Sequence, residues 1–330
     1  MTSRFSQLSV DQIRERYVRG GQPVSGAMLA KLRRDPRQGV RRIYEVLERR
    51  YGRERSERAR LDAMLHFERV LWGAGLTRVA GVDESGMGPM AGPVVAAAVV
   101  FRPETTVDGI DDSKKLLPEE RDRLSEVIRG AATGIGIGLA DVDEIDRVNI
   151  HAAGLLAMRR AVEALPLAPE HVLVDARTIP DLDVRQNGFN RGDGLSYSIA
   201  AASIIAKTHR DRLMEALDRE HPGYGLAQHK GYCTAAHQQA IRELGPSPVH
   251  RQSFLYIREL LGEMSARFYA LKREVDHAGT AETLGALEAG IEGSRDALTE
   301  YELRKLRLVI SRRWKSVSRT AAKHRHVRQC

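Results

Sequence analysis

Four short apolar segments stand between residues 79 and 175, in a chain whose other apolar residues mostly recur at helical spacing. Residues 79–82 and 94–101 are bounded by glycine and proline, which predicts two strands joined by a tight turn. Residues 134–139 alternate glycine with aliphatic residues, which predicts a strand against which another element packs very closely. Residues 172–175 read as a short buried strand that ends in an acid.

Helical patterns surround these segments. They run from residue 10 to 73, from residue 118, over 149–165 and 198–220, and again from about residue 235. Because strands and helices interleave, the order predicts an α/β fold with a mixed sheet, flanking helices, and helical extensions at both ends. A phosphate-binding glycine loop at 134–139 is the alternative, but no helix start follows directly and no Gly-Lys-Ser/Thr is present.

The composition is that of a folded chain outside the membrane. Of the 330 residues 42% are hydrophobic and 29% charged, and no apolar run approaches the ~20 residues that span a bilayer. No secretory apolar region follows the start of the chain, so we expect a cytoplasmic protein without a membrane contact. Two cysteines, Cys233 and Cys330, are too few for a disulfide framework or a four-ligand zinc site. Any metal must therefore bind mostly to oxygen.

The charge is distributed unevenly along the chain. Residues 1–75 hold 17 basic and 9 acidic residues, residues 301–330 hold 10 and 1, and the part between them holds 25 and 34. This pattern predicts an acidic core between two ends that attract polyanions. For the N-terminal part a solvated helix face is an equally good interpretation, whereas the C-terminal run favours a polyphosphate partner.

Acidic residues follow the predicted strands. Asp83 and Glu84 come directly after the first strand, Asp175 ends another, and Asp193 lies in a glycine-flanked turn. Since ligands of α/β sheets bind at strand ends, these side chains are predicted to converge, and converging carboxylates favour Mg²⁺ or Mn²⁺. Two such ions can activate a water and stabilise the leaving oxygen of a phosphodiester. The alternative is that each acid is only a turn or cap residue.

The stretch from residue 79 to 99, VAGVDESGMGPMAGPVVAAAV, closely resembles the opening of bacterial ribonuclease HII. Further motifs follow in the family's order, and the resemblance extends over about residues 65–256. They include DSKKL at 112–116, VLVD at 172–175, AAASIIAK at 200–207 and HKGY at 229–232.

The resemblance implies a ribonuclease H-like fold in which Asp83, Glu84, Asp175 and Asp193 are the catalytic, metal-binding carboxylates. Asp211, accompanied by Lys207, is the alternative fourth acid. Asp193 is preferred because it falls in the family's lysine-glycine-aspartate motif, which reads Arg-Gly-Asp here. Enzymes of this family cut the RNA strand of RNA–DNA hybrids, and also cut on the 5′ side of a single ribonucleotide in duplex DNA, leaving 3′-hydroxyl and 5′-phosphate ends.

Substrate-binding residues follow from the same motifs. A glycine loop directly after the acid pair lets the backbone approach the 2′-hydroxyl that distinguishes RNA from DNA. The resemblance implies that lysines meet phosphates and that a tyrosine stacks on the sugar beside the ribonucleotide. The expected substrate-binding residues are Gly86, Met87, Gly88, Lys114, Lys115, Lys230 and Tyr232.

One departure from the family motif affects specificity. The family's glycine-arginine-glycine reads Gly86-Met87-Gly88 here, and methionine cannot donate a hydrogen bond. An alternative is therefore a preference for longer hybrids, as in ribonuclease HIII, a sister type that also lacks the arginine. Two further hypotheses are a hybrid-binding protein with weak hydrolysis and a DNA-only nuclease. A binding module has no reason to keep four mutually repelling carboxylates, which favours the enzyme.

The sequence predicts three parts. Residues 1–73 form a basic helical extension, residues 74–262 the catalytic domain with its C-terminal helices, and residues 263–330 a basic helical tail whose role the sequence does not indicate. We expect a monomer that acts on nucleic acid; the sequence indicates no protein partner.

Overall fold

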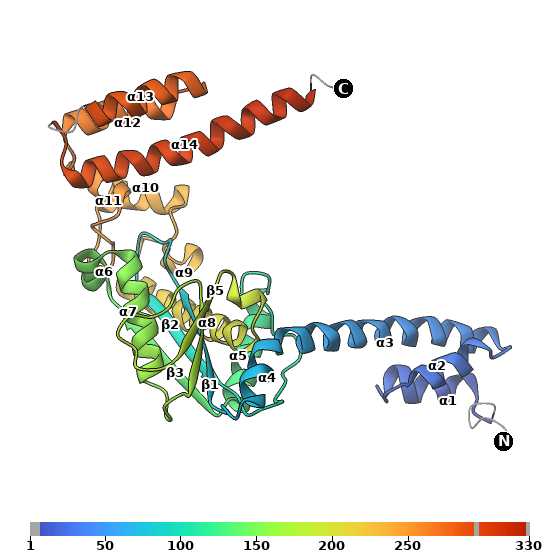
Figure 1. Cartoon of the computed structure of the whole chain (residues 1–330). Coiled ribbons are helices and arrows are strands. Elements are labelled where there is room, and N and C mark those ends of the chain that lie inside the picture. Colours follow the sequence, from blue (N-terminus) through green and yellow to red (C-terminus); the bar gives the residue numbers. More distant parts are fainter. Residues whose placement is uncertain (1–6, 294–296, 328–330) are drawn as a thin grey trace. The chain divides into compact units, whose positions relative to one another are not determined.

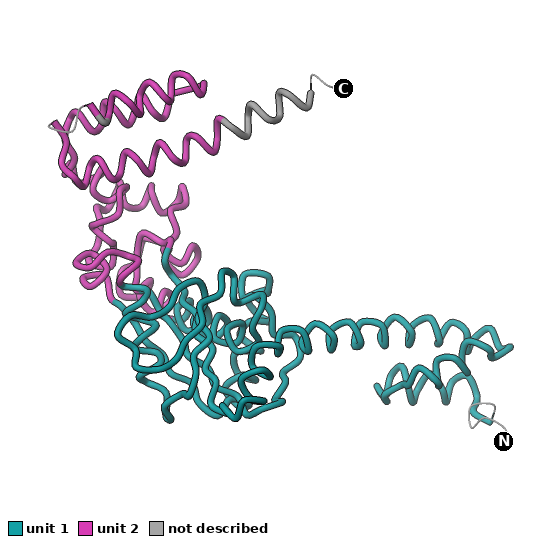
Figure 2. Tube along the Cα trace, viewed as in Figure 1, with its two compact units in different colours: residues 1–87, 94–140, 153–212 teal, residues 88–93, 141–152, 213–330 magenta. Residues whose placement is uncertain are grey.

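The computed structural model describes residues 7–293 and 297–327, with no side-chain description for residues 292 and 318–327. The start of the chain, Cys330 and the side chains of the last basic residues of the tail therefore lie outside the described part. The chain divides into two compact units (Figure 2). Unit 1 comprises residues 1–87, 94–140 and 153–212, and unit 2 comprises residues 88–93, 141–152 and 213–330.

The N-terminal part of unit 1 is helical, as predicted. Ser9 and Ser25 begin two of its helices by accepting hydrogen bonds from backbone N–H groups of the first turn. Apolar residues from these helices, among them Ile13, Leu32 and Leu47, form a small core of their own. The helices are α1 (Val10–Ile13), α2 (Gly26–Arg33), α3 (Gln38–Met64) and α4 (His66–Gly73), with a π-helical stretch at Arg14–Arg19.

The centre of unit 1 is a five-stranded sheet with the order β3-β2-β1-β4-β5 (Figure 1). β1 pairs antiparallel with β2, and β2 antiparallel with β3, whereas β1–β4 and β4–β5 are parallel. The predicted mixed sheet is thereby confirmed. The strands are β1 (Val79–Ser85), β2 (Val94–Val100), β3 (Gly134–Ala140), β4 (His171–Asp175) and β5 (Gln186–Phe189).

The strand prediction needs correction at one connection and missed one strand. The connection from β1 to β2 is not a tight turn, because residues 88–93 belong to unit 2, where the Met90 N–H donates to the Gly231 carbonyl. The glycine and proline residues predicted a connection between the strands but not its length, which runs from residue 86 to 93. The strand β5 was missed, since its sequence Gln-Asn-Gly-Phe lies at a sheet edge and carries no apolar pattern.

Three helices of the α/β domain were predicted at the observed places: α5 (Pro118–Ala131), α7 (Ile150–Glu163) and α8 (Tyr197–Glu220). The glycines of β3 explain how closely α7 packs. A Cβ at Gly136 would lie 2.0 Å from the Ala161 carbonyl oxygen, and one at Gly138 2.1 Å from that of Ala157. The glycine alternation therefore serves helix packing, and the phosphate-loop alternative is wrong.

Unit 2 is largely helical. The predicted helices of the C-terminal tail are confirmed in the described residues, where they form a separate apolar core around Phe268, Leu284 and Leu306. The helix α6 was missed, although Asp141 and Glu144 form a capping box at its start. No described helix is long and apolar enough to cross a membrane. The remaining helices are α6 (Val142–Val148), α9 (Leu226–His229), α10 (Ala235–Leu244), α11 (Leu255–Leu260), α12 (Ala266–His277), α13 (Ala281–Gly293) and α14 (Glu300–Val327).

Candidate active site

Three of the predicted carboxylates meet at one edge of the sheet. β1 and β4 are parallel neighbours in which Val82 is paired with Val174, so the next residues, Asp83 near the end of β1 and Asp175 at the end of β4, lie side by side. Glu84 adds a third carboxylate, and ligand oxygens of the three residues all lie within 4.8 Å of one another. The parallel pairing therefore brings together acids that are far apart in the sequence.

The electrostatics of this cluster require a proton or a cation. Asp83 is only 4% exposed, and burial together with the charges of Glu84 and Asp175 raises the pKa of Asp83 well above its usual value. Burial, and next the charge of Asp175, raise the pKa of Glu84 to about 7. The Glu84 Oε2 atom is buried and has no hydrogen-bond partner among the described residues. An oxygen-rich, incompletely satisfied cluster of this kind suits a hard divalent cation.

Asp193 lies beside this cluster, in a single 3₁₀ turn at Gly192–Gly194. It is buried, and burial followed by the charge of Asp112 raises the pKa of Asp193. Its own charge contributes to the raised pKa values of Asp83 and Glu84. Although its oxygens are not among those within 4.8 Å of one another, Asp193 is part of the same electrostatic site.

Asp211, the alternative fourth acid, has a different environment. On α8, its carboxylate lies 2.5 Å from the Lys207 Nζ and 3.2 Å from an Arg121 guanidinium nitrogen. Two cations thus balance one carboxylate. This arrangement holds the helix α8 to Arg121 of α5, and it leaves less negative charge for a metal ion than Asp193 offers.

Of the two predicted phosphate-binding lysines in unit 1, Lys114 lies beside the carboxylates and Lys115 pairs with another acid. The Lys114 Nζ lies 3.7 Å from an Asp193 oxygen, and the Lys114 side chain is largely exposed. Burial opposes the charged form, but the carboxylates of Asp193 and Asp83 outweigh it and raise the pKa of Lys114. Lys115 instead pairs with Asp111 at 2.9 Å. Gly86, with φ of +102°, makes the turn that follows the acid pair.

The remaining predicted substrate-binding residues lie in unit 2. Tyr232 is 46% exposed, and its ring is the nearest neighbour that a Cβ at Gly88 would meet, at 3.7 Å. Lys230 pairs with Glu215 at 2.6 Å. Unit 2 therefore presents an exposed aromatic ring beside a glycine backbone, together with a lysine that already has a carboxylate partner.

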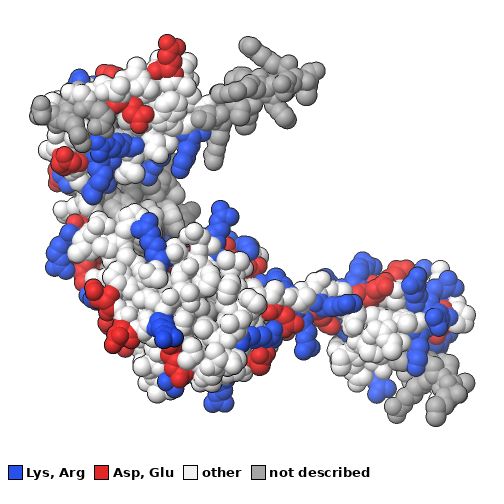
Figure 3. All heavy atoms as spheres, viewed as in Figure 1, with Lys and Arg blue, Asp and Glu red and all other residues white. Residues whose placement is uncertain are grey.

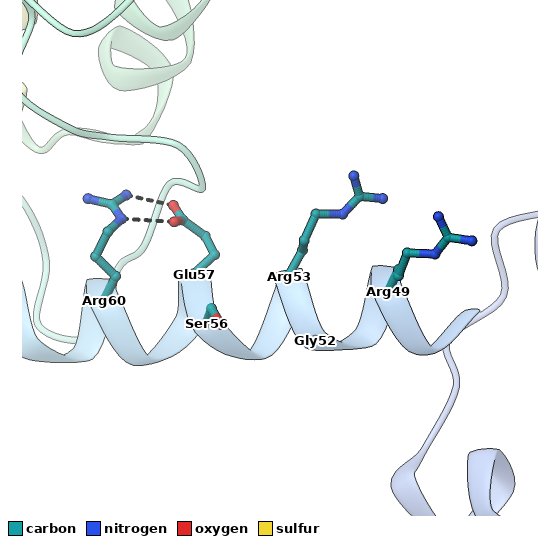
Figure 4. Close-up of a pocket in the computed structure, with 6 residues that line it drawn as sticks. All are labelled: Arg49, Gly52, Arg53, Ser56, Glu57 and Arg60. Atoms are coloured by element: carbon teal, nitrogen blue, oxygen red, sulfur yellow. Dashed lines mark hydrogen bonds and ion pairs between the residues drawn. The ribbon is translucent and has the colours of Figure 1, made fainter. Parts of the chain in front are cut away.

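Basic residues gather on the helices at both ends of the chain (Figure 3). In unit 1 a hollow along α3 is lined by residues of that helix alone, including Arg49, Arg53 and Arg60 (Figure 4). Arg60 is paired with Glu57 at 2.6 Å. The hollow contains none of the clustered carboxylates, so it is an arginine-lined helix face and not a catalytic pocket.

Comparison with known proteins shows which family has a similar sequence. Residues 80–257 match the family model described as Ribonuclease HII, and residues 9–72 match the one described as Ribonuclease HII N-terminal domain. The chain belongs to the ribonuclease HII family. The Myxococcus xanthus ribonuclease HII is 51% identical over 257 residues, which cover 78% of this chain and 88% of the relative. The ribonuclease HII of an Anaeromyxobacter species is 49% identical over 258 residues, covering 78% and 82%. The crystal structure of ribonuclease H2 from Pyrococcus horikoshii OT3 aligns with a TM-score of 0.48 and 25% identity, covering 56% of this chain and 97% of that one.

Membership confirms the predicted family and enzyme class. A ribonuclease HII is a metal-dependent nuclease that cleaves the RNA strand of RNA–DNA hybrids, and the cluster of Asp83, Glu84 and Asp175 offers a metal-binding site. The N-terminal helices, predicted from the sequence as a basic helical extension, match a named domain of this family. The matched regions end at residue 257, so α12, α13 and α14 lie beyond them.

Proposed function

We propose that this member of the ribonuclease HII family cleaves the RNA strand of hybrids and also cuts on the 5′ side of a single ribonucleotide in duplex DNA, leaving 3′-hydroxyl and 5′-phosphate ends. The observation that carries the proposal is the convergence of the buried carboxylate of Asp83 and the partly buried carboxylates of Glu84 and Asp175 within 4.8 Å. Together with Asp193 they would hold two Mg²⁺ or Mn²⁺ ions. Such ions, when bound, activate a water and stabilise the leaving oxygen of the phosphodiester.

The chain's own residues prepare the site for a polyanionic substrate. Burial favours the protonated forms of Asp83 and Glu84, so a bound cation would take the place of a proton as the partner of their charge. Lys114 stays charged beside Asp193 and is exposed, so it meets a substrate phosphate. At Gly86 the absence of a side chain lets the backbone come close to the ribose 2′-hydroxyl.

Unit 2 supplies further contacts in this proposal. The exposed ring of Tyr232 is available to stack on a sugar, and Lys230 contacts phosphate in competition with Glu215. On α14, Arg304 and Arg312 are exposed and contact the nucleic-acid backbone without reading its sequence. Mg²⁺ and Mn²⁺ both suit the all-oxygen ligand set.

Two further interpretations of the same scaffold have specific observations behind them. Met87 in place of the family's arginine favours a preference for longer hybrids, as in ribonuclease HIII. Basic surfaces on α3 and α14 would suit a hybrid-binding protein with weak hydrolysis. The clustered carboxylates argue against the second interpretation, because they repel a polyanion unless cations are bound.

The decisive experiment is cleavage of three end-labelled duplexes of one sequence: all-DNA, one embedded ribonucleotide, and a full RNA–DNA hybrid. We expect Mg²⁺- or Mn²⁺-dependent cutting of the last two only. Asp83→Asn should lower turnover by about 100-fold or more while hybrid binding is retained or strengthened, since one repelling charge is removed. The exposed Asp122, paired with Arg212 away from the cluster, provides the control variant Asp122→Asn. Cleavage at the wild-type rate by Asp83→Asn, or cutting of the all-DNA duplex, would contradict the proposal.

A further inference from the structure

Glu68 is a buried acid that the sequence patterns did not single out. It lies on α4 and is only 1% exposed. Its Oε1 atom accepts hydrogen bonds from the Ser196 hydroxyl at 2.6 Å, the Ser198 hydroxyl at 2.6 Å and the Ser198 N–H at 2.9 Å. No salt bridge to Glu68 is found within the described residues. A buried carboxylate without a cation is costly, so its three donors must hold it in place.

These donors belong to the turn that begins α8, the helix that follows Asp193. The carboxylate of Glu68 lies at the N-terminal end of that helix, where a negative charge interacts favourably with the helix dipole. The strand β1 touches the same turn, because a Cβ at Gly81 would lie 2.1 Å from the Ser198 carbonyl carbon. The turn is thus fixed between the N-terminal domain and the strand that carries Asp83.

A continuous series of hydrogen bonds runs from Glu68 to a predicted metal ligand. The Ser196 hydroxyl donates to Glu68, the Ser196 N–H donates to the Gly192 carbonyl at 2.8 Å, and the Gly192 N–H donates to Asp175 Oδ1 at 2.6 Å. Gly192 is closely surrounded, since a Cβ there would lie 2.7 Å from Ile199 Cδ1 and 3.3 Å from Asp175 Oδ1. Any shift of this turn therefore moves the partner of Asp175.

We infer that Glu68 is a positioning residue of the metal site, acting through Ser196 and Gly192 on Asp175 and on the adjoining Asp193. The N-terminal domain then does more than extend the chain, because one of its side chains sets the geometry of the carboxylates. This inference rests on the proposed function, since it assumes that Asp175 and Asp193 bind the cations.

The test is Mn²⁺ binding by calorimetry without substrate, on the full chain, for the wild type and Glu68→Gln. The glutamine keeps the size and one acceptor oxygen but loses the charge. We expect Mn²⁺ affinity to fall by about tenfold, in line with other residues that orient metal ligands through hydrogen bonds. In hybrid cleavage, kcat should fall at low Mn²⁺ and recover at high Mn²⁺, with KM for the hybrid unchanged.

Controls separate positioning from general stability. Val40→Ala removes apolar contact in the small core of the N-terminal helices, far along α3 from the hydrogen-bonded series, and should lower stability without changing Mn²⁺ affinity. If Glu68→Gln behaves like Val40→Ala, losing stability but binding Mn²⁺ as the wild type does, the inference is wrong. Should Glu68→Gln fail to fold, Ser196→Ala removes the hydroxyl that donates to Glu68 and keeps the N–H that donates to Gly192. A loss of Mn²⁺ affinity of a few-fold is then expected, and wild-type affinity in Ser196→Ala overturns the inference.

Asp83→Asn distinguishes failure of this inference from failure of the proposed function. Wild-type Mn²⁺ affinity in Asp83→Asn would contradict the proposed metal site itself, and with it the proposed function. A loss of Mn²⁺ binding in Asp83→Asn, together with unchanged binding in Glu68→Gln, would overturn the role of Glu68 alone.

Discussion

His237 Nε2 lies 3.0 Å from His250 Nε2, and both rings are buried in unit 2. The His237 Nδ1 atom faces the Tyr232 carbonyl at 2.9 Å and must carry a proton to bond to it. The His250 Nδ1 atom accepts from the Ser247 N–H at 2.9 Å, so the His250 proton sits on Nε2 and is donated to His237. Each ring is therefore neutral and in one tautomer. The hydrogen bonds run from the Ser247 N–H through His250 and His237 to the Tyr232 carbonyl.

The buried histidine pair predicts a loss of stability in acid. Burial lowers the pKa of both His237 and His250 to about 4, below the unfolded value of 6.5. The unfolded chain therefore binds more protons between these values, so stability is complete above pH 6.5 and declines as the pH falls toward 4. The full loss is about 3 kcal/mol per histidine.

Urea unfolding followed by circular dichroism at pH 7.5 and pH 5 measures this effect. His250→Gln should be less stable at pH 7.5 and should lose less stability on acidification than the wild type. The exposed His151, on α7, provides the control variant His151→Gln, for which the wild-type pH dependence is expected. An identical pH dependence in His250→Gln and the wild type would show that the pair does not titrate as the structure indicates.

A comparison of Asp193→Asn with Asp211→Asn identifies the fourth acid. Asp193→Asn should lower kcat and raise the Mg²⁺ concentration needed for half-maximal activity, because a charge close to Asp83 and Glu84 is lost. Asp211→Asn should keep most activity but cost about 1–3 kcal/mol of stability, since Arg121 and Lys207 lose their partner. The opposite pattern, with Mg²⁺ dependence altered only in Asp211→Asn, would assign the fourth position to Asp211.

The basic face of α14 predicts a contribution to affinity that depends on salt. Deleting residues 301–330 is a poor test, because Leu303, Leu306 and Ile310 belong to the apolar core of the C-terminal helices. The double variant Arg304→Gln/Arg312→Gln removes two exposed charges and leaves that core intact. We expect weaker hybrid binding, a slope of log affinity against log salt that is smaller by about 2, and an unchanged cut position.

The matched variant Arg49→Gln/Arg53→Gln removes the same charge from α3 (Figure 4). This variant decides whether α3 also contacts nucleic acid or is only a solvated face. If α3 is a solvated face, the affinity for the hybrid and its dependence on salt stay unchanged. If the α14 variant also leaves both quantities unchanged at low salt, the basic face of α14 is a solvated face or a site for another partner.

The sequence predicts those residues of the site that a local sequence pattern marks. Asp83 and Asp175 follow short apolar runs, and strand ends in an α/β sheet converge, so their meeting was predictable. Glu68 was not, because its partner Ser198 lies 130 positions away and nothing in the helical pattern of α4 distinguishes a buried acid from a solvated one. The histidine pair was missed for the same reason: the two rings come from different segments, and only tertiary packing makes them a pair.

Met87 lies in unit 1, two residues after the end of β1, the strand that carries Asp83 and Glu84. Its side chain rests against Gly154 of α7, where a Cβ would lie 2.9 Å from the Met87 sulfur. The family's arginine at this place would offer up to five N–H donors to a phosphate or ribose, whereas methionine offers none. Loss of one hydrogen bond to a charged group costs roughly 1.5–3 kcal/mol.

We expect that cost to fall mainly on the substrate with a single ribonucleotide, because it has no neighbouring 2′-hydroxyls to offer other contacts. The enzyme should therefore favour multi-ribonucleotide hybrids, with cleavage at one ribonucleotide reduced but still present through the backbone of Gly86 and Gly88. Met87→Arg should raise the ratio of single-site to hybrid kcat/KM by about tenfold or more. Met87→Leu, which preserves the apolar contact with Gly154, should leave the ratio unchanged. If Met87→Arg gives the wild-type ratio, the methionine has no part in substrate preference.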